Sequence, residues 1–343
     1  MEKNLSALGF MSGTSGDGVD TSIINSNGTD TLNIKYNRFD PYPIYLSEKI
    51  HRIKDSISNM QDLLKYSSEI EELEIEITNF HADIANKTSK EINYDLIGFH
   101  GHTIYHNTDE KISKQIGQGV NLSKLTNKTV VYDFRQNDIK NGGEGAPLTP
   151  IYHLTLIKAL FSENKVKIPI SILNIGGIAN ITEIDKNFKI KSRDIGPGNC
   201  LIDKWIKINA NKHFDKDGQI SSKGSINKII LDQALDNYYN NDVSKLKSYD
   251  TKDFDLSFVR GLSLEDGAAT LIEYTAEILS QRMKNHKIYL SGGGRKNKYL
   301  INRIKSKTKD NVCLIDEINI DGDFIESQAF AYLAIRSFLK LPI

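Results

Sequence analysis

A glycine-rich turn between two strand-like segments occurs twice in this sequence, and the repeat limits the folds that the chain can adopt. Near the N-terminus, an apolar run at 5–10 leads into a glycine loop, and an alternating segment at 19–24 leads out of it. In the second half, 170–175 and 178–184 are strand-like on either side of the turn 176–177. Because period-two alternation is typical of strands, each copy predicts strand, turn, strand. Two related halves of this kind would face each other across a cleft, where small-molecule sites usually form.

The first glycine loop has the composition of a phosphate-binding loop. Residues 9–20 hold four glycines, three hydroxyl side chains and two carboxylates. Glycine lets the backbone approach a ligand closely, so that successive amide N–H groups can surround a phosphate. A Walker P-loop is excluded because the loop has no lysine, and a Rossmann fingerprint is excluded because a strand follows instead of a helix. An ordinary hairpin turn remains the alternative.

Composition indicates a globular protein. At 343 residues the chain can form two domains, and its 44 Lys and Arg balance its 44 Asp and Glu. Without a basic excess we expect no nucleic-acid partner, and without a long apolar run we expect no membrane segment. Cys200 and Cys313 lie far apart in a chain with no secretory leader. A cytoplasmic location without a disulfide is therefore expected.

Between the two glycine turns, the chain is expected to alternate strands with helices. A third strand is predicted at 32–36, an amphipathic surface helix at 60–89, and a helix that Thr149 caps and Pro150 begins. His100, His102 and His106 follow an apolar run, so they are either a metal site or polar residues at a strand end.

Arg135 closes a strand predicted at 129–135 and precedes the glycine-rich segment 142–148. Its planar guanidinium suits an anion or a sugar hydroxyl. The alternative is an ordinary ion pair with Asp133 or Asp138.

A carboxylate in the second half has the setting of a catalytic base. Asp194 ends a strand predicted at 190–194, just before Gly196, Gly198 and a helix. A plain helix cap is the alternative, but a cap does not require the two glycines. Further on, three glycines at 292–294 join a strand at 287–290 to a helix from Lys298. Such a triplet lets a flat ring or a phosphate approach the backbone, whereas a simple connection rarely needs three glycines.

Six motifs together carry a family resemblance that covers nearly the whole chain. In order and spacing they resemble those of the anhydro-N-acetylmuramic acid kinases, and they occupy 13–20, 98–103, 133–135 with 142–148, 174–180, 194–199 and 291–294. The resemblance implies an α/β fold of two actin-like ATPase (ribonuclease H-like) domains, as in hexokinase and Hsp70, with mixed sheets flanked by helices and an interdomain cleft. The first domain is expected at 1–135, completed by a C-terminal helix at 325–343, and the second at 136–324.

The resemblance also implies a reaction. An enzyme of this family uses ATP and Mg²⁺ to hydrolyse the 1,6-anhydro bridge of its sugar and to phosphorylate the released O6, in cell-wall recycling. Asp194 matches the general base, and Asp194 and Glu326 are candidate Mg²⁺ ligands. A cytoplasmic homodimer is implied, with the sugar and ATP as small-molecule partners.

The resemblance further assigns binding residues. The expected sugar contacts are Arg135, Glu326, His100 and Gly143. The expected ATP contacts are Gly13, Thr14, Ser15, Gly16, Asp17, Gly18, Val19, Asp20, Gly176, Asn180, Gly196, Gly198, Asn199, Gly292, Gly293 and Gly294.

Three departures from the family pattern leave the sugar open. His102 and Glu144 stand where the family usually has Gln, and 247–253 follows the family segment only in part. A kinase for another anhydro-sugar, such as levoglucosan, is the first alternative. A non-catalytic sugar sensor is the second, although a sensor has no need of a base such as Asp194.

Overall fold

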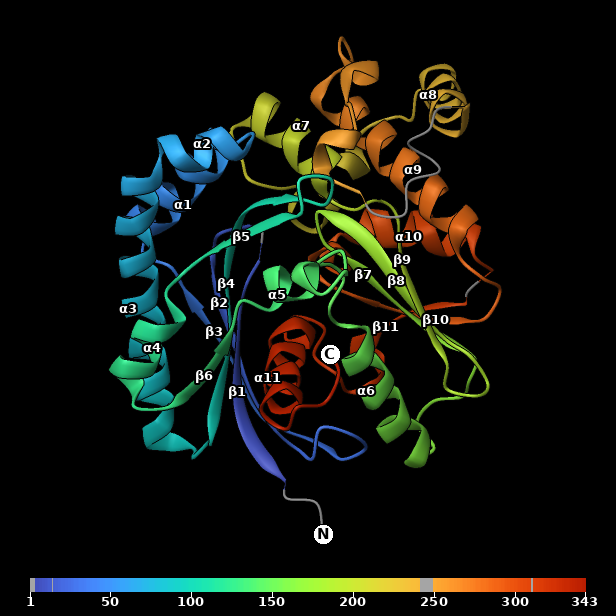
Figure 1. Cartoon of the computed structure of the whole chain (residues 1–343). Coiled ribbons are helices and arrows are strands. Elements are labelled where there is room, and N and C mark those ends of the chain that lie inside the picture. Colours follow the sequence, from blue (N-terminus) through green and yellow to red (C-terminus); the bar gives the residue numbers. More distant parts are fainter. Residues whose placement is uncertain (1–3, 14, 241–248, 310) are drawn as a thin grey trace. The chain divides into compact units, whose positions relative to one another are not determined.

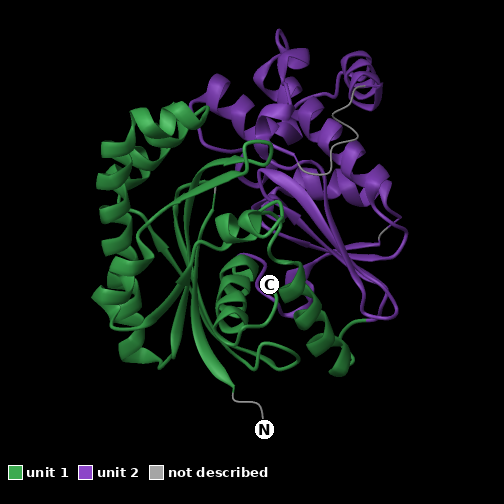
Figure 2. Cartoon of the chain, viewed as in Figure 1, with its two compact units in different colours: residues 1–166, 324–343 green, residues 167–323 purple. Residues whose placement is uncertain are grey.

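The chain forms two compact units in the computed structural model, which describes residues 4–13, 15–240, 249–309 and 311–343. Unit 1 comprises Met1–Val166 and Phe324–Ile343, and unit 2 comprises Lys167–Asp323 (Figure 2). Unit 1 is therefore discontinuous in sequence, because its last helix follows the whole of unit 2.

Unit 1 is built on a six-stranded mixed sheet (Figure 1). Its strands are β1 (Leu5–Ser12), β2 (Gly18–Ser26), β3 (Leu32–Pro41), β4 (Leu96–Asn107), β5 (Ile112–Ile116) and β6 (Thr129–Tyr132). The order is β3-β2-β1-β4, with β5 and β6 both pairing with β4. Strands β1, β4 and β6 are parallel, whereas β2 is antiparallel to both of its neighbours.

Helices cover both faces of the unit 1 sheet. They are α1 (Ile44–Ser56), α2 (Met60–Lys65), α3 (Ser67–Glu91), α4 (Gly119–Thr126), α5 (Phe134–Lys140), α6 (Pro150–Ser162) and α11 (Ile325–Phe338). Leu8 and Phe10 of β1 pack in one core with residues of α1 and α3. Between them, Gly9 faces α11 so closely that a Cβ there would overlap the backbone carbonyl oxygen of Ser327. Alternation along β1 thus assigns one face to each helix layer.

Unit 2 has a five-stranded sheet in the order β11-β10-β7-β8-β9. Its strands are β7 (Ile170–Ile175), β8 (Ile178–Ile184), β9 (Ile190–Pro197), β10 (Lys287–Ser291) and β11 (Val312–Leu314), and its helices are α7 (Cys200–Ala210), α8 (Lys228–Asn240), α9 (Leu264–Arg282) and α10 (Lys298–Lys307). Again β7, β10 and β11 are parallel and β8 is antiparallel to its neighbours. Apolar residues of β7, β8 and β9 pack with α7, α9 and α10 in one core.

The two sheets share one topology. Strands β3-β2-β1-β4-β6 and β9-β8-β7-β10-β11 have the same order and the same pattern of parallel and antiparallel pairs. This confirms the repeat that the glycine turns predict, and with it the fold class, an α/β fold with two mixed sheets flanked by helices of the actin-like ATPase (ribonuclease H-like) type.

The structure divides the chain at other residues than the sequence predicts. The expected boundary at 135/136 lies at 166/167 instead, and 323/324 replaces 324/325. The cause is α6, whose Tyr152 hydroxyl donates a 2.5 Å hydrogen bond to Gln328 of α11. Helix α6 therefore belongs to unit 1.

Two predicted elements also differ from those in the structure. The strand expected at 129–135 ends at Tyr132, and its side chains are partly or fully exposed, because β6 lies at an edge of the sheet. The helix expected at 60–89 is broken at Tyr66, whose ψ of 17° is not helical. Asn59 caps the first piece by accepting hydrogen bonds from the backbone of Gln61 and Asp62.

Candidate active site

The predicted phosphate loop is the tip of the β1–β2 hairpin in unit 1. Gly16 has a φ of 60°, and its N–H donates to the Gly13 carbonyl at 3.1 Å, which closes the turn. Asp17 is exposed at the tip, where its carboxylate accepts a 2.5 Å hydrogen bond from Ser15. Gly18, Val19 and Asp20 already belong to β2, and Thr14 lies outside the described residues. The loop is therefore a tight turn with backbone groups at an exposed end of the sheet.

Arg135 and His100 form the centre of a second cluster in unit 1. Arg135, on α5, donates from Nε to His100 Nε2 at 2.8 Å and from Nη1 to the Gly145 carbonyl at 2.9 Å. Because Nε2 accepts, the proton of a neutral His100 lies on Nδ1, which is 2.8 Å from the Gly101 carbonyl. Burial and the Arg135 charge lower the pKa of His100 well below its usual value. His100 is thus a neutral acceptor that aims the guanidinium.

Glu326, in the first turn of α11, lies near enough to this guanidinium for the charge of each group to affect the pKa of the other. Burial raises the pKa of the Glu326 carboxyl, and the positive charge of Arg135 opposes part of the rise. Burial likewise lowers the pKa of Arg135, and Glu326 opposes that change. The structure therefore brings Arg135, His100 and Glu326 together as three polar groups suited to hydroxyl and carboxyl recognition.

The glycine segment after α5 is held by one carboxylate. Asp138 Oδ2 accepts a 2.8 Å hydrogen bond from the Gly145 N–H, and a Cβ at Gly143 would overlap the same carboxylate. Gly143 and Glu144 are exposed. Among the described residues, Arg135 makes no ion pair with Asp133 or Asp138; Asp133 lies 4.0 Å from Lys140 instead.

The three histidines of β4 do not share a site. His100 contacts Arg135, His102 Nδ1 lies 3.0 Å from Ser12 Oγ, and His106 Nδ1 lies 3.0 Å from Ser113 Oγ. They lie within a strand and not in a loop. Within the described ranges, no group of three His, Cys, Asp or Glu side chains could hold a metal ion.

In unit 2, two glycine turns meet at one end of the sheet. The N–H groups of Gly198 and Asn199 donate to the carbonyls of Gly177 and Gly176 at 3.0 and 2.8 Å. A Cβ at Gly198 would overlap the Gly176 carbonyl, so only glycine permits this approach. Gly196, with a φ of 150°, is packed against Ile278. The predicted residues 176 and 196–199 therefore form one backbone structure.

Asp194 lies within β9, close to these turns. It is paired with Asn180 of β8, and its Oδ2 accepts a 2.9 Å hydrogen bond from the Tyr249 N–H. Asp194 is therefore not a helix cap, because Asn199 precedes α7. Asn180 Oδ1 is buried without a hydrogen-bond partner among the described residues. An amide oxygen of this kind is an acceptor that a ligand hydroxyl or bound water can satisfy.

The glycine triplet joins the same end of the unit 2 sheet. Gly292 has a φ of 78°, and a Cβ on Gly294 would overlap Ile175 of β7, whereas a Cβ on Gly293 would meet no atom within 4 Å. The loop is held by Arg295, whose guanidinium contacts Asp316 at 2.8 Å and Asp323 at 2.7 Å. Backbone with open space in front of Gly293 fits a ligand that approaches closely.

In each unit, the residues predicted for the site include a carboxylate that suits the metal ion of a nucleotide. Mg²⁺ usually keeps several waters and takes one or two carboxylates together with phosphate oxygens, so it does not need a preformed cluster. Asp194 in unit 2 and Glu326 in unit 1 are carboxylates of the required kind.

No helix among the described residues is both long and apolar enough to span a membrane.

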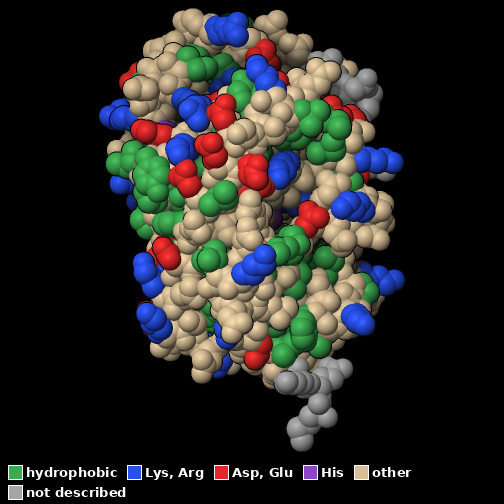
Figure 3. Space-filling model, turned by 60° about the vertical axis from the view of Figure 1, so that its left-hand side comes forward, with side chains coloured by type: hydrophobic (Ala, Val, Ile, Leu, Met, Phe, Trp, Pro, Cys, Tyr) green, Lys and Arg blue, Asp and Glu red, His purple; other side chains and the backbone are tan. Residues whose placement is uncertain are grey.

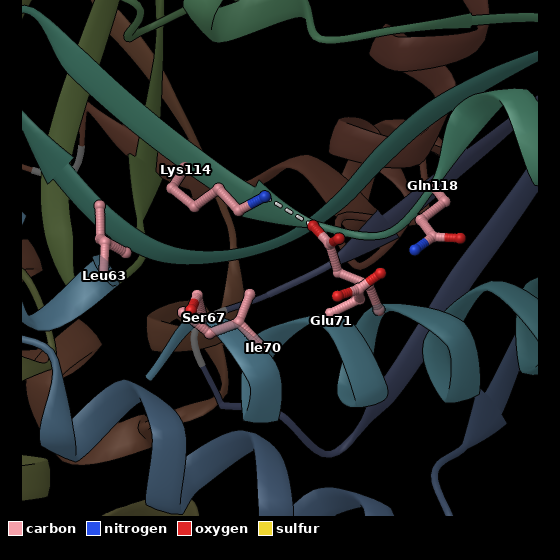
Figure 4. Close-up of a pocket in the computed structure, with 7 residues that line it drawn as sticks. Leu63, Ser67, Ile70, Glu71, Lys114 and Gln118 are labelled. Carbon is pink, nitrogen blue, oxygen red and sulfur yellow. Dashed lines mark hydrogen bonds and ion pairs between the residues drawn. The ribbon is translucent and has the colours of Figure 1, made fainter. Parts of the chain in front are cut away.

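A separate hollow of about 320 Å³ lies on unit 1, away from the residues predicted for the site. It is lined by Leu63, Ser67, Ile70, Glu71, Glu74, Lys114 and Gln118, and an ion pair of 2.6 Å between Lys114 and Glu74 borders it (Figure 4).

On the molecular face of Figure 3, basic and acidic side chains are interspersed, with no continuous area of one sign.

Sequence reasoning missed four residues that support the site. Asp138 holds the glycine segment 142–148, and Arg295 holds the triplet loop 292–294. Tyr249 donates to Asp194, and Arg282 donates to Tyr249. Arg295 directly follows the triplet, which is a usable signal. The divergent segment 247–253 drew attention to Tyr249 only as a departure, and Lys247 and Ser248 lie outside the described residues. Nothing in the sequence around Arg282 indicates its role.

Comparison with known proteins identifies the family. The family model described as anhydro-N-acetylmuramic acid kinase matches residues 5–343. The chain is 48% identical to "Anhydro-N-acetylmuramic acid kinase" of Pelagibacter ubique, covering 100% of this chain and 94% of that protein. It is 37% identical to the protein of the same name from Zymomonas mobilis, with 98% and 94% covered. A ROK family glucokinase from Streptomyces griseus, solved with glucose and AMPPNP, gives a TM-score of 0.42 at 11% identity over 96% and 98% of the chains, too little to bear on activity. The chain belongs to the anhydro-N-acetylmuramic acid kinase family.

Proposed function

We propose that this chain is an ATP-dependent kinase that opens the 1,6-anhydro bridge of 1,6-anhydro-N-acetylmuramic acid and phosphorylates O6, in cell-wall recycling. The products are N-acetylmuramic acid 6-phosphate and ADP. The family match over residues 5–343 supports the substrate. The observation that carries the chemistry is Asp194, a carboxylate oriented by a backbone amide beside two glycine turns.

Asp194 is the general base of the proposed reaction. It takes a proton from water as the water oxygen bonds to the anomeric carbon, and the bond from that carbon to O6 breaks. O6 then bonds to the γ-phosphorus of ATP, and the bond to the β-phosphate oxygen breaks to release ADP. Most of the rate enhancement comes from alignment and from neutralising phosphate charge.

The binding roles divide between the units. In unit 1, the sugar is bound by Arg135, Glu326, His100 and Gly143, and His100 also orients the Arg135 guanidinium. The β1–β2 turn, from Gly13 to Asp20, binds phosphates. In unit 2, Gly176, Asn180 and 196–199 bind phosphates, and 292–294 lies along the adenosine. When bound, Mg²⁺ neutralises phosphate charge, with Asp194 and Glu326 as its candidate protein ligands.

The proposal includes a cytoplasmic homodimer without nucleic-acid or membrane partners. A kinase for another anhydro-sugar and a non-catalytic sensor are not favoured, because the two relatives of 48% and 37% identity are both named anhydro-N-acetylmuramic acid kinase. His102 and Glu144 remain the positions at which the sugar preference could differ.

A coupled ADP-release assay with Mg·ATP tests the function. It compares 1,6-anhydro-N-acetylmuramic acid, levoglucosan and N-acetylmuramic acid. Turnover with the first alone supports the proposal, turnover with levoglucosan alone changes the substrate, and no turnover with any of them favours the sensor. Asp194→Asn should abolish turnover and leave ATP binding nearly unchanged; a variant with full turnover would remove Asp194 as the base.

A further inference from the structure

The carboxylate of Asp194 is oriented by a segment that has no regular secondary structure of its own. The Tyr249 N–H donates to Asp194 Oδ2 at 2.9 Å, and Tyr249 lies outside the helices and strands. A backbone amide in a loop keeps its direction only if something else fixes the loop. Tyr249 is fixed by its own side chain, which is 6% exposed and packs against Phe254 with ring centroids 5.2 Å apart.

Arg282, the last residue of α9, holds that side chain in place. Its Nη1 donates to the Tyr249 hydroxyl at 2.6 Å. Its guanidinium carbon lies 5.8 Å from the centre of the Tyr249 ring and 5.5 Å from that of Tyr238. The hydroxyls of the two tyrosines are 3.1 Å apart. A planar cation that both donates to a hydroxyl and lies near two aromatic rings restricts rotation of the ring it contacts.

The same arginine is tied to the strand that carries Asp194. Its backbone carbonyl accepts a 3.0 Å hydrogen bond from Nη2 of Arg193, the residue directly before Asp194. Arg193 is in turn 3.2 Å from the buried carboxylate of Glu183. The contacts thus form a closed circuit from Asp194 through Tyr249, Arg282 and Arg193 back to Asp194. All of its members belong to unit 2.

We propose that Arg282 and Tyr249 are positioning residues for the general base, acting through the Tyr249 amide on Asp194 Oδ2. The inference rests on the proposed role of Asp194. A carboxylate whose Oδ2 accepts from a fixed backbone donor presents a more constant direction to the attacking water, and small misplacements of a base reduce turnover strongly. Tyr249, Arg282 and Arg193 are not among the residues proposed to bind the sugar or ATP, so replacing Tyr249 or Arg282 should lower turnover more than affinity.

The test compares four single variants of the full chain, the fourth being Arg282→Lys. Tyr249→Phe removes only the hydroxyl that Arg282 contacts, and Arg282→Met removes the cation while keeping a long side chain. Tyr274→Phe is the matched control, because Tyr274 is another buried tyrosine of the same core, packed against Tyr238 and Phe258. For each variant, kcat, the KM for ATP and for the sugar, the Kd for ADP and the Tm are measured, and kcat is taken well below the Tm.

We expect kcat to fall about 10-fold in Tyr249→Phe and about 10- to 100-fold in Arg282→Met, with KM and Kd within about twofold of wild type. Arg282→Lys, which keeps the charge and a donor, should recover part of the loss. Tyr274→Phe should keep full kcat even if its Tm falls. This split distinguishes positioning from a general loss of stability.

The results distinguish a failure of the positioning role from a failure of the proposed base. If Asp194→Asn is inactive while Tyr249→Phe and Arg282→Met keep full kcat, the positioning role is wrong and the base stands. If the two variants weaken ADP binding as much as they lower kcat, or if Tyr274→Phe loses as much turnover, the circuit has only a structural role. If Asp194→Asn is fully active, the proposed base itself is wrong.

Discussion

The Nε–H group of Arg135 donates to Nε2 of His100 at 2.8 Å. An uncharged imidazole, and not a charged carboxylate, accepts this hydrogen bond. Because His100 is neutral, it does not neutralise the positive charge of Arg135. A carboxylate or hydroxyl of a ligand can therefore use that charge, and His100 supplies direction without competing for it.

Replacing His100 should weaken sugar binding more than nucleotide binding. His100→Phe keeps a ring against Phe330, whose centroid lies 4.4 Å away, but removes the acceptor for Arg135. A hydrogen bond to a charged group contributes about 1.5–3 kcal/mol, so kcat/KM for the sugar should fall about 10- to 100-fold. Steady-state kinetics with each substrate varied in turn measure this. His106→Phe on the same strand is the control, and an equal effect of both variants would contradict the specific role of His100.

His102 should make stability depend on pH below about 6.5. Burial lowers the pKa of His102 to about 3 from an unfolded value near 6.5, so the unfolded chain binds the extra proton. Its contribution to stability is complete above pH 6.5 and is lost as the pH falls toward 3, at a cost of about 2 kcal/mol at pH 5. In His102→Gln, the difference in unfolding free energy between pH 7 and pH 5 should shrink by that amount.

Urea unfolding followed by circular dichroism at the two pH values measures this difference. The exposed His213→Gln provides the control. If His102→Gln unfolds with the pH dependence of the wild-type protein, the assignment of that dependence to His102 is wrong.

Gly293 and Gly294 should respond differently to alanine. A Cβ at Gly293 meets no atom within 4 Å, so Gly293→Ala should fold with wild-type stability. If nucleotide approaches this backbone, the added methyl should raise the KM for ATP several-fold with kcat little changed. Gly294→Ala overlaps Ile175 and should lose stability instead. An unchanged KM in a stable Gly293→Ala variant would mean that nucleotide does not approach there.

Arg295 and Lys296 are adjacent basic residues whose loss should differ in cost. The Arg295 side chain is 6% exposed and contacts Asp316 and Asp323, whereas that of Lys296 is 60% exposed. Arg295→Met removes the cation from Asp316, while Asp323 keeps Lys296 at 2.7 Å, and should cost about 2 kcal/mol or more; Lys296→Met should cost below about 1 kcal/mol. The single tryptophan, Trp205, is buried in unit 2, so its fluorescence during urea unfolding follows this unit. Equal costs would contradict the structural role of Arg295.

Most of the architecture could be predicted because it depends on local patterns. Glycine turns between alternating strands specified both hairpins, and the triplet before Lys298 specified the passage from β10 to α10. The boundary at 166 could not be predicted, because it depends on α6 packing with α11, which is contributed by the far end of the chain. The break at Tyr66 was missed for a simpler reason, since apolar spacing continues across it.

The site was predictable only as residue types in motifs. Arg135 and Asp194 were named as candidates from their motifs, but Arg135 was placed in a strand and lies on a helix. Its partner His100 comes from β4, and the partner of Asp194 comes from a loop 55 residues away. Contacts of this kind are set by tertiary packing, which leaves no periodic signal in one sequence.

The close packing of Gly9 on Ser327 has a consequence for the order in which the chain is made. During synthesis β1 leaves the ribosome before unit 2, and the helix that covers one of its faces is translated only after the whole of unit 2. Unit 2 is contiguous and can complete its core while unit 1 still exposes that face of β1, β2 and β4. A nascent chain stalled before residue 324 therefore carries an uncovered apolar sheet face, the natural target of a chaperone until α11 emerges.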